Sequence, residues 1–386
     1  MNNQIDLLFA LLRHALKKEE LPDSVAAHLS EENAELLLPL AKSQDVGQII
    51  ADQLAEKLPA GSEVLAKFQK LQMLALFRHE SLCREQAEIC RVFEAAGIDH
   101  MLLKGAVIRP LYPEAYWRTS CDIDILVKEH DLDRAAALLV EKLSYQTDGK
   151  ITFHDVSLHA PSGVHLELHF HIKEDIKGMD KVLGRVWEYA KPVEDTSHQY
   201  VQAPAFLLFH VIAHMARHIS HGGCGIKPFA DLFLIKRSLT YDEHQLQDLL
   251  ATANLKRFYE VVNDLTSVWL EGGTHTDLTA DMERYVLQGG LYGTVSRKLT
   301  VAQGKRGSKL RYILSRIFMP YRILKRRYPS LDGRRWLTPI YQVHRWCATL
   351  FGGKMKRIKK ELQTTNSIED TAARDAAQLL CDIGLQ

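Results

Sequence analysis

The 386-residue sequence lacks the features that define several broad classes of protein. It has no run of about 18 uninterrupted apolar residues, so we expect no membrane-spanning helix. Its six cysteines are scattered and form no CxxC pair, which argues against a disulfide framework or a cysteine-rich zinc site and favours a reducing, cytoplasmic setting. The first 20 residues include neither a basic segment nor a small-residue cleavage site, so they predict an amphipathic helix instead of a signal peptide.

Negative charge is almost absent from one long stretch. Residues 297–360 contain 19 Lys and Arg but a single acid, Asp332, whereas the rest of the chain carries 30 basic and 47 acidic residues. Aromatic residues lie among these cations, and the composition suits an anionic partner. The candidates are a nucleic acid, a phosphorylated glycan or the inner membrane surface, where the protein would be peripheral and Lys354–Lys360 is the most lipid-like part. The alternative is a solvated surface that balances the acidic remainder.

Hydrophobic periodicity predicts the general organisation of the chain. Apolar residues recur at helical spacing before residue 97 and again after residue 203, whereas short apolar runs and helical patterns alternate between them. We therefore predict an α+β fold, in which a small mixed-sheet core is flanked by N-terminal and C-terminal helical regions. The predicted parts are 1–96 (helical), 97–200 (α/β core), 201–296 (helical) and 297–386 (basic and largely helical).

Turn and cap residues locate individual elements of the core. Asp131 is a suitable N-cap for a helix, a Pro-Ser-Gly turn near residue 161 predicts a hairpin, and Pro204 suits the first turn of a helix that runs to residue 219. The predicted strands are 98–103, 122–127, 151–159 and 164–172, and the predicted helices between them are 106–112 and 132–143.

The most informative pattern is the carboxylate pair of Asp122-Ile123-Asp124-Ile125. On a strand, residues two apart point to the same face, so both carboxylates project together while the isoleucines face the core. Two acids so arranged are unfavourable unless they are solvated or bridged by a cation. Mg²⁺ prefers carboxylate oxygens and shares its coordination with substrate phosphates. The pair therefore predicts a metal site for phosphate chemistry, with a solvated strand edge as the alternative.

Two further patterns suit the same chemistry. Lys104-Gly105-Ala106 follows a predicted buried strand and opens a helix, where glycine lets a phosphate approach free backbone N–H groups. The predicted strand 164–172 alternates strictly and places Glu167 among histidines on its polar face, where a third metal ligand or a general base would lie. The alternatives are an ordinary turn for Gly105 and a solvent-facing sheet residue for Glu167.

These residues resemble the uncharacterised nucleotidyltransferase family, a branch of the polymerase-β-like nucleotidyltransferase superfamily. The resemblance covers most of residues 1–330 and rests on Leu103-Lys104-Gly105, Arg118, the Asp122–Val127 segment and Leu166-Glu167-Leu168-His169. It implies a mixed-sheet core that binds an NTP as co-substrate and Mg²⁺ (or Mn²⁺) as cofactor. The implied catalytic and metal-binding residues are Asp122, Asp124 and Glu167, and the implied nucleotide-binding residues are Lys104, Gly105, Arg118 and His169.

The sequence departs from the superfamily pattern at the phosphate turn. Ala106 follows Gly105 where the superfamily usually has Ser or Gly, so no hydroxyl is available at that position. The spacer of 15 residues from Ala106 to Asp122 is also longer than the superfamily norm.

Three histidines recur every four residues in the predicted helix 204–219, so they lie along one face. We interpret His210, His214 and His218 as a polar seam that contacts nucleotide or acceptor, with Asp231 in a following helix as a pairing partner. A purely structural seam is the alternative. No HExxH motif is present, and zinc is a less favoured interpretation here and at the histidine-rich strand.

The sequence therefore predicts an enzyme that moves a nucleoside monophosphate from an NTP to an unknown hydroxyl or phosphate acceptor. One alternative is a catalytically inactive module that binds a nucleotide. Another is a protein that binds nucleic acid or a membrane surface through the basic tract 297–360.

Overall fold

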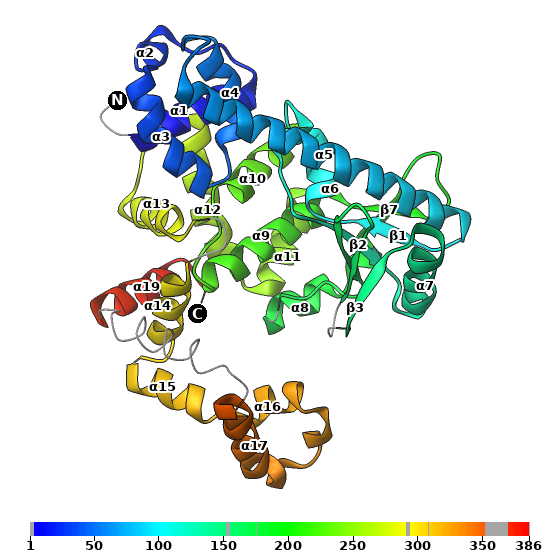
Figure 1. Cartoon of the computed structure of the whole chain (residues 1–386). Helices are drawn as coiled ribbons and strands as arrows, with labels where there is room; N and C mark the ends of the chain where they lie inside the picture. Colours follow the sequence, from blue (N-terminus) through cyan, green and yellow to red (C-terminus); the bar gives the residue numbers. More distant parts are fainter. Residues whose placement is uncertain are drawn as a thin grey trace.

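The computed structural model describes residues 4–151, 155–174, 176–290, 294–307, 309–351 and 370–385 (Figure 1). It is mainly helical and contains one mixed sheet of seven strands, so the predicted α+β fold is confirmed. Lys354–Lys360 of the basic tract lie outside the described residues. The division of the chain into four parts stays a prediction.

Among the residues described from Gln4 onward, five helices precede the first strand, as the periodicity of residues 1–96 predicts. The last of them is 33 residues long and runs from the N-terminal helices along the sheet (Figure 1). Its first half packs through Phe68 with the N-terminal helices, and its second half packs through Phe93 against the sheet. The five are α1 (Gln4–Lys17), α2 (Asp23–Ala26), α3 (Glu31–Ser43), α4 (Gly47–Ala55) and α5 (Glu63–Ala95).

The sheet has the strand order β3-β4-β5-β2-β1-β7-β6. The pairs β2–β5 and β1–β7 are parallel and the other neighbours are antiparallel. The strands are β1 (His100–Leu102), β2 (Asp122–Val127), β3 (Gln146–Ile151), β4 (Asp155–His159), β5 (His165–His169), β6 (Ala190–Pro192) and β7 (Gln199–Gln202). The sequence predicted β1, β2, β4 and β5 but missed β3, β6 and β7.

Two helices follow the central strands β1 and β2 in the chain. They are α6 (Gly105–Ile108), which continues as a 3₁₀ turn, and α7 (Leu132–Leu143). Asp131 is the N-cap residue of α7, as predicted, but its side chain makes no cap hydrogen bond. The chain instead enters α7 through the 3₁₀ turn Glu129–Asp131, in which the backbone of Asp131 is already helical.

Helices dominate the rest of the chain. The Pro204 prediction is confirmed, since Pro204 is the first residue of its helix. No helix among the described residues is both long and apolar enough to cross a membrane. The helices are α8 (Lys177–Leu183), α9 (Pro204–Ser220), α10 (Lys227–Ser238), α11 (Glu243–Ala253), α12 (Lys256–Glu271), α13 (Asp277–Gly289), α14 (Val295–Gly304), α15 (Lys309–Ile317), α16 (Tyr321–Arg327), α17 (Thr338–Phe351) and α19 (Asp370–Asp382).

The two faces of β2 belong to different cores, and this positions the site. Ile123, Ile125 and Val127 are buried together with residues of α5 and α7. Leu126 lies on the opposite face, in the large core that includes α9 and α10. Alternation along the strand places Asp122 and Asp124 on the Leu126 face, so the carboxylates point toward the helical region that contains α9.

Candidate active site

The carboxylate cluster is built by the parallel pairing of β2 with β5. In this register Asp124 lies opposite Glu167, and Asp122 lies opposite His165. Two sets of side chains have ligand atoms within 4.8 Å of one another, and each set could hold a metal ion. The sets are Asp122, His165 and Glu167, and Asp124, Glu167 and His169. The structure therefore brings the three sequence-predicted acids together.

Two cations hold Asp124. The Nζ of Lys104 lies 3.1 Å from Asp124 Oδ1, and Nε2 of His169 lies 2.8 Å from the same oxygen. Nε2 of His169 also lies 3.4 Å from Glu167 Oε2. Asp124 and His169 are both buried, so these contacts operate where water screens them little. Lys104 and His169, both predicted as nucleotide-binding residues, thus contact the acids directly.

The neighbouring charges shift the pKa values of these acids in opposite directions. Burial would raise the pKa of Asp124, but Lys104 and His169 outweigh burial and lower it well below the usual range. The pKa of Asp122 is raised by burial and by the negative charges of Asp124 and Glu167. Asp122 is therefore the acid that a bound cation would stabilise most.

His169 and Glu167 form a matched acid and base. Burial would lower the pKa of His169, but its hydrogen bonds to Asp124 and Glu167 raise it to about 9. The same hydrogen bond from His169 is the main cause of a lowered pKa for Glu167. At neutral pH the imidazole is therefore protonated and the carboxylate is ionised.

The donor set fits a divalent cation that prefers oxygen ligands. Asp122, Asp124 and Glu167 provide three carboxylates, and the raised pKa of Asp122 indicates that their negative charge is incompletely balanced. A cation at this position would compete with Lys104 and His169 for Asp124. Histidine nitrogens occur in both sets, but His169, while it is protonated, has no free lone pair for a metal and acts as a cation beside the carboxylates.

The turn at Gly105 is tight, as the sequence pattern indicates. Lys104 has a positive φ of 46° and α6 begins at the next residue. A Cβ added to Gly105 would lie 3.1 Å from Ser120 Oγ and 3.6 Å from Arg118 Nη1. A side chain there would be crowded by Ser120 Oγ, whereas Arg118 Nη1 would lie at an ordinary contact distance, so the space beside Gly105 is narrow on the side of Ser120. Ser120 is a neighbour that sequence reasoning missed.

The structure corrects the predicted partner of Asp231. This buried carboxylate accepts hydrogen bonds from Arg118 Nε and Nη2, each at 2.8 Å, and from Tyr112 Oη at 2.7 Å. The reason is that α10 packs against both α9 and the segment between α6 and β2, and Asp231 faces that segment, which carries Tyr112 and Arg118. The ion pair fixes Arg118 beside Gly105.

The histidine seam of α9 divides into members with different surroundings. His210 is buried, and its Nδ1 lies within hydrogen-bond distance of the side chain of Gln202. Burial is the main cause that lowers the pKa of His210 to about 3, so its ring is neutral. His214 Nδ1 lies 2.8 Å from Glu174 Oε1, and the His218 ring packs edge-on against His214 at 4.4 Å between centroids.

A pocket of about 180 Å³ connects the carboxylates to α9. Glu174, which sequence reasoning missed, is buried there between His214 and Arg217, whose Nε lies 3.3 Å from Glu174 Oε2. It follows β5 in an irregular segment where no periodic pattern marks it. Asp155, opposite His169 on β4, was also missed. The lining comprises Leu103, Lys104, Asp155, Glu167, His169, Ile172, Lys173, Glu174, His214 and Arg217.

Comparison with known protein families agrees with this geometry. A model of an uncharacterised nucleotidyltransferase family matches residues 30–271. The chain belongs to this nucleotidyltransferase family. The match includes every strand of the sheet and ends at the last residue of α12, so it contains the carboxylates and α9 but not the basic tract. No curated protein matches the chain. Membership makes the chain an enzyme of nucleotide transfer, as the sequence predicted.

Proposed function

We propose that this nucleotidyltransferase moves a nucleoside monophosphate from an NTP to a hydroxyl or phosphate acceptor and depends on Mg²⁺ or Mn²⁺. The observation that carries the proposal is the register of β2 and β5, which places Asp124 opposite Glu167 and beside Asp122 on one face. Three converging carboxylates suit a cation that also coordinates phosphate oxygens. When bound, such a cation neutralises negative charge on the triphosphate and on the departing pyrophosphate.

Side chains of the protein then accept the proton of the acceptor and orient the groups that hold the metal. An acceptor oxygen forms a new bond to the α-phosphorus while the bond from that phosphorus to pyrophosphate breaks, and the electron pair leaves with pyrophosphate. Glu167, ionised at neutral pH, takes the proton of a hydroxyl acceptor. A phosphate acceptor is already ionised and needs no base. Asp122 and Asp124 hold the metal, and His169 orients both Asp124 and Glu167.

The turn around Gly105 is the proposed binding place of the triphosphate. Arg118 and Lys104 bring positive charge to this turn. Ser120 Oγ lies beside Gly105, so Ser120 supplies near this turn the hydroxyl group that the side chain of Ala106 lacks. Glu174 orients His214 and Arg217 at the other side of the pocket.

A direct test is thermal unfolding with each NTP, with Mg²⁺ or with chelator. A ligand that binds the native state raises the melting temperature by mass action, so one NTP with metal should raise it in the wild type. The shift should vanish in Asp122→Asn and Asp124→Asn. Asp264→Asn, which changes an exposed acid on α12, is the matched control and should retain it.

Pyrophosphate release separates turnover from binding alone. We expect metal-dependent release from the same NTP, and its loss in Asp124→Asn with the fold intact. Retention of full activity in Asp124→Asn would refute the assignment. An NTP shift without pyrophosphate release, tested over hydroxyl and phosphate acceptors, would instead identify a nucleotide-binding module.

The basic tract favours one of its three candidate partners. Seven of the thirteen exposed large hydrophobic side chains among the described residues lie between residues 314 and 343. Apolar side chains next to cations suit the interface of an anionic membrane better than a nucleic acid or a glycan. We therefore propose that this region docks the enzyme on an anionic membrane surface. The seven are Leu314, Ile317, Phe318, Ile323, Trp336, Ile340 and Val343.

A further inference from the structure

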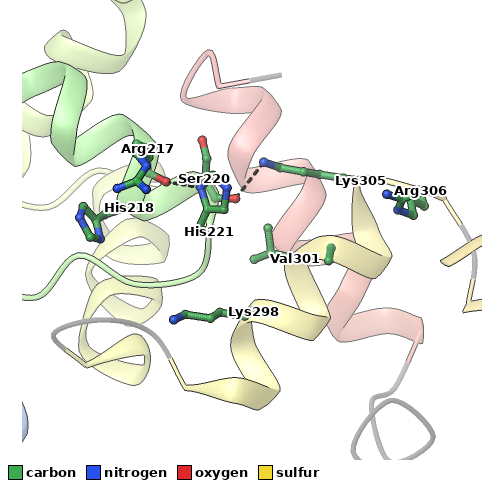
Figure 2. Close-up of a pocket in the computed structure, with 9 residues that line it drawn as sticks. Arg217, His218, Ser220, His221, Lys298, Val301, Lys305 and Arg306 are labelled. Atoms are coloured by element: carbon green, nitrogen blue, oxygen red, sulfur yellow. Dashed lines mark hydrogen bonds between the residues drawn. The ribbon is translucent and has the colours of Figure 1, made fainter. Parts of the chain in front are cut away.

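A second and larger pocket of about 440 Å³ lies between the C-terminal end of α9 and α14 (Figure 2). Figure 2 shows Lys298 and Lys305 reaching from α14 toward the end of α9, with Val301 between them. His218, a member of the predicted seam, lines this pocket. Its lining comprises Arg217, His218, Ser220, His221, Lys298, Val301, Ala302, Lys305 and Arg306.

The lining is cationic and contains no acid. Lys305 Nζ donates to the backbone carbonyl of Ser220 at 2.8 Å, and burial lowers the pKa of this lysine without any carboxylate to oppose the shift. Among the described residues, Arg217 alone of the lining side chains lies within ion-pair distance of a carboxylate, that of Glu174. Concentrated positive charge of this kind suits a phosphate group.

The pocket adjoins the carboxylate pocket. Arg217 lines both of them. His214 lines the carboxylate pocket and His218 lines the cationic one, with their rings in contact and their Cα atoms about 6 Å apart along α9. The two pockets are therefore neighbours along the C-terminal half of α9.

The size of the pocket restricts the kind of ligand. Its volume falls within the range of roughly 300–1,000 Å³ that is usual for small-molecule sites. It therefore suits a small phosphorylated molecule or a single headgroup better than a nucleic-acid strand, which needs an extended groove.

We propose that the pocket between α9 and α14 binds a phosphate group of the acceptor and so presents the acceptor's reactive oxygen to the carboxylate pocket. This inference rests on the proposed function. The phosphate belongs either to a soluble phosphorylated compound or to a lipid headgroup, because both present the same chemistry to Lys298 and Lys305.

The test measures binding to the full chain by titration calorimetry in the presence of chelator. The probes are inorganic phosphate and dihexanoyl phosphatidic acid, a water-soluble lipid that exposes a phosphate headgroup. Lys298→Gln/Lys305→Gln should weaken binding at least about tenfold, because charge-assisted hydrogen bonds are lost. Lys57→Gln/Lys70→Gln removes the same charge at exposed positions elsewhere and should bind like the wild type. Lys298→Gln alone spares the contact of Lys305 with Ser220 and should also weaken binding.

The outcomes separate the proposals. The probe that binds more tightly identifies the source of the phosphate. Absence of binding to the wild type, or equal binding by all variants, would overturn the inference. The melting shift with NTP and metal should persist in Lys298→Gln/Lys305→Gln; its loss would show that the pocket holds the donor triphosphate and not the acceptor. Absence of that shift in the wild type would refute the proposed function, and with it the acceptor role, even if phosphate binds.

Discussion

The single buried charge of Glu174 holds several neighbouring side chains in place. Burial would raise its pKa, but His214 and Lys104 outweigh burial and lower it to about 2. The same carboxylate holds His214 and Arg217, the second of which lines both pockets. Glu174 therefore connects the proposed chemistry at β5 to the proposed acceptor site at α14.

The pKa of Glu174 predicts how stability depends on pH. A carboxyl whose pKa is lowered in the folded state stabilises that state above its unfolded value of 4.5, and this contribution is lost as the pH falls toward 2. The unfolding free energy of the wild type should therefore exceed that of Glu174→Gln above pH 4.5. The excess should shrink by roughly 1.4 kcal/mol per pH unit below it.

Urea unfolding of the two proteins between pH 3 and pH 7 measures this difference. Glu271→Gln, at the end of α12 and exposed, is a control that should show no such pH-dependent excess. A constant difference between wild type and Glu174→Gln across the range would contradict the prediction.

For individual residues, the sequence predicted some members of the site and missed others, and the difference has a physical reason. Asp122, Asp124 and Glu167 lie on strands, where alternation shows which side chains share a face. Glu174 lies in irregular chain, and its neighbours Arg217 and Lys104 come from distant elements. Only tertiary structure joins such residues, and the corrected pairing of Asp231 with Arg118 has the same cause.

Elements were predictable where burial imposes a pattern. β2 and β5 alternate because one face packs against α5 and α7, and both were predicted. β6 and β7 have three and four residues, mostly polar or half-buried, and β6 lies at the edge of the sheet. β3 lies at the other edge and is rich in polar residues. Pairing with a neighbour forms these strands, so their own sequences contain little signal.

The close contact between α14 and α19 predicts how a substitution would affect the packing of these two helices. A Cβ added to Gly304 would overlap the carbonyl oxygen of Ala373, so the two helices approach more closely than any side chain allows. Gly304→Ala should separate them and destabilise their contact by about 1–3 kcal/mol. Hydrogen exchange followed by mass spectrometry should show faster exchange in α14 and α19, with β2 and β5 unchanged.

Gly61→Ala is the matched control for that substitution. A Cβ added to Gly61 meets nothing within 4 Å, and the exchange of all elements should stay as in the wild type. Unchanged exchange in Gly304→Ala would mean that α19 does not hold α14 in solution.

In the whole molecule, the tract that concentrates positive charge also concentrates exposed apolar side chains. In Figure 1, α15, α16 and α17 extend away from the sheet. The proposed membrane docking predicts that Trp336→Ser, which removes a side chain that is 74% exposed, weakens binding to phosphatidylglycerol vesicles by about tenfold. Phe77→Ser removes a side chain that is 75% exposed on α5 and should not weaken it.

Vesicle sedimentation at several salt concentrations measures both effects. Binding of the wild type should fall as salt rises, because cations of the tract contribute to it. Equal binding by Trp336→Ser and wild type, or an equal loss in Phe77→Ser, would exclude this docking mode.

The large core contains Leu8 from α1 and Leu380 from α19. A polypeptide emerges from the ribosome in order, so the residues of α19 that complete this core become available only after the helices that precede α19 have been synthesised. Until then the apolar faces of the earlier helices lack their final neighbours and offer binding surface to chaperones. The core is therefore incomplete until α19 has been synthesised, and a chain that is cut before α19 leaves apolar faces of the earlier helices uncovered.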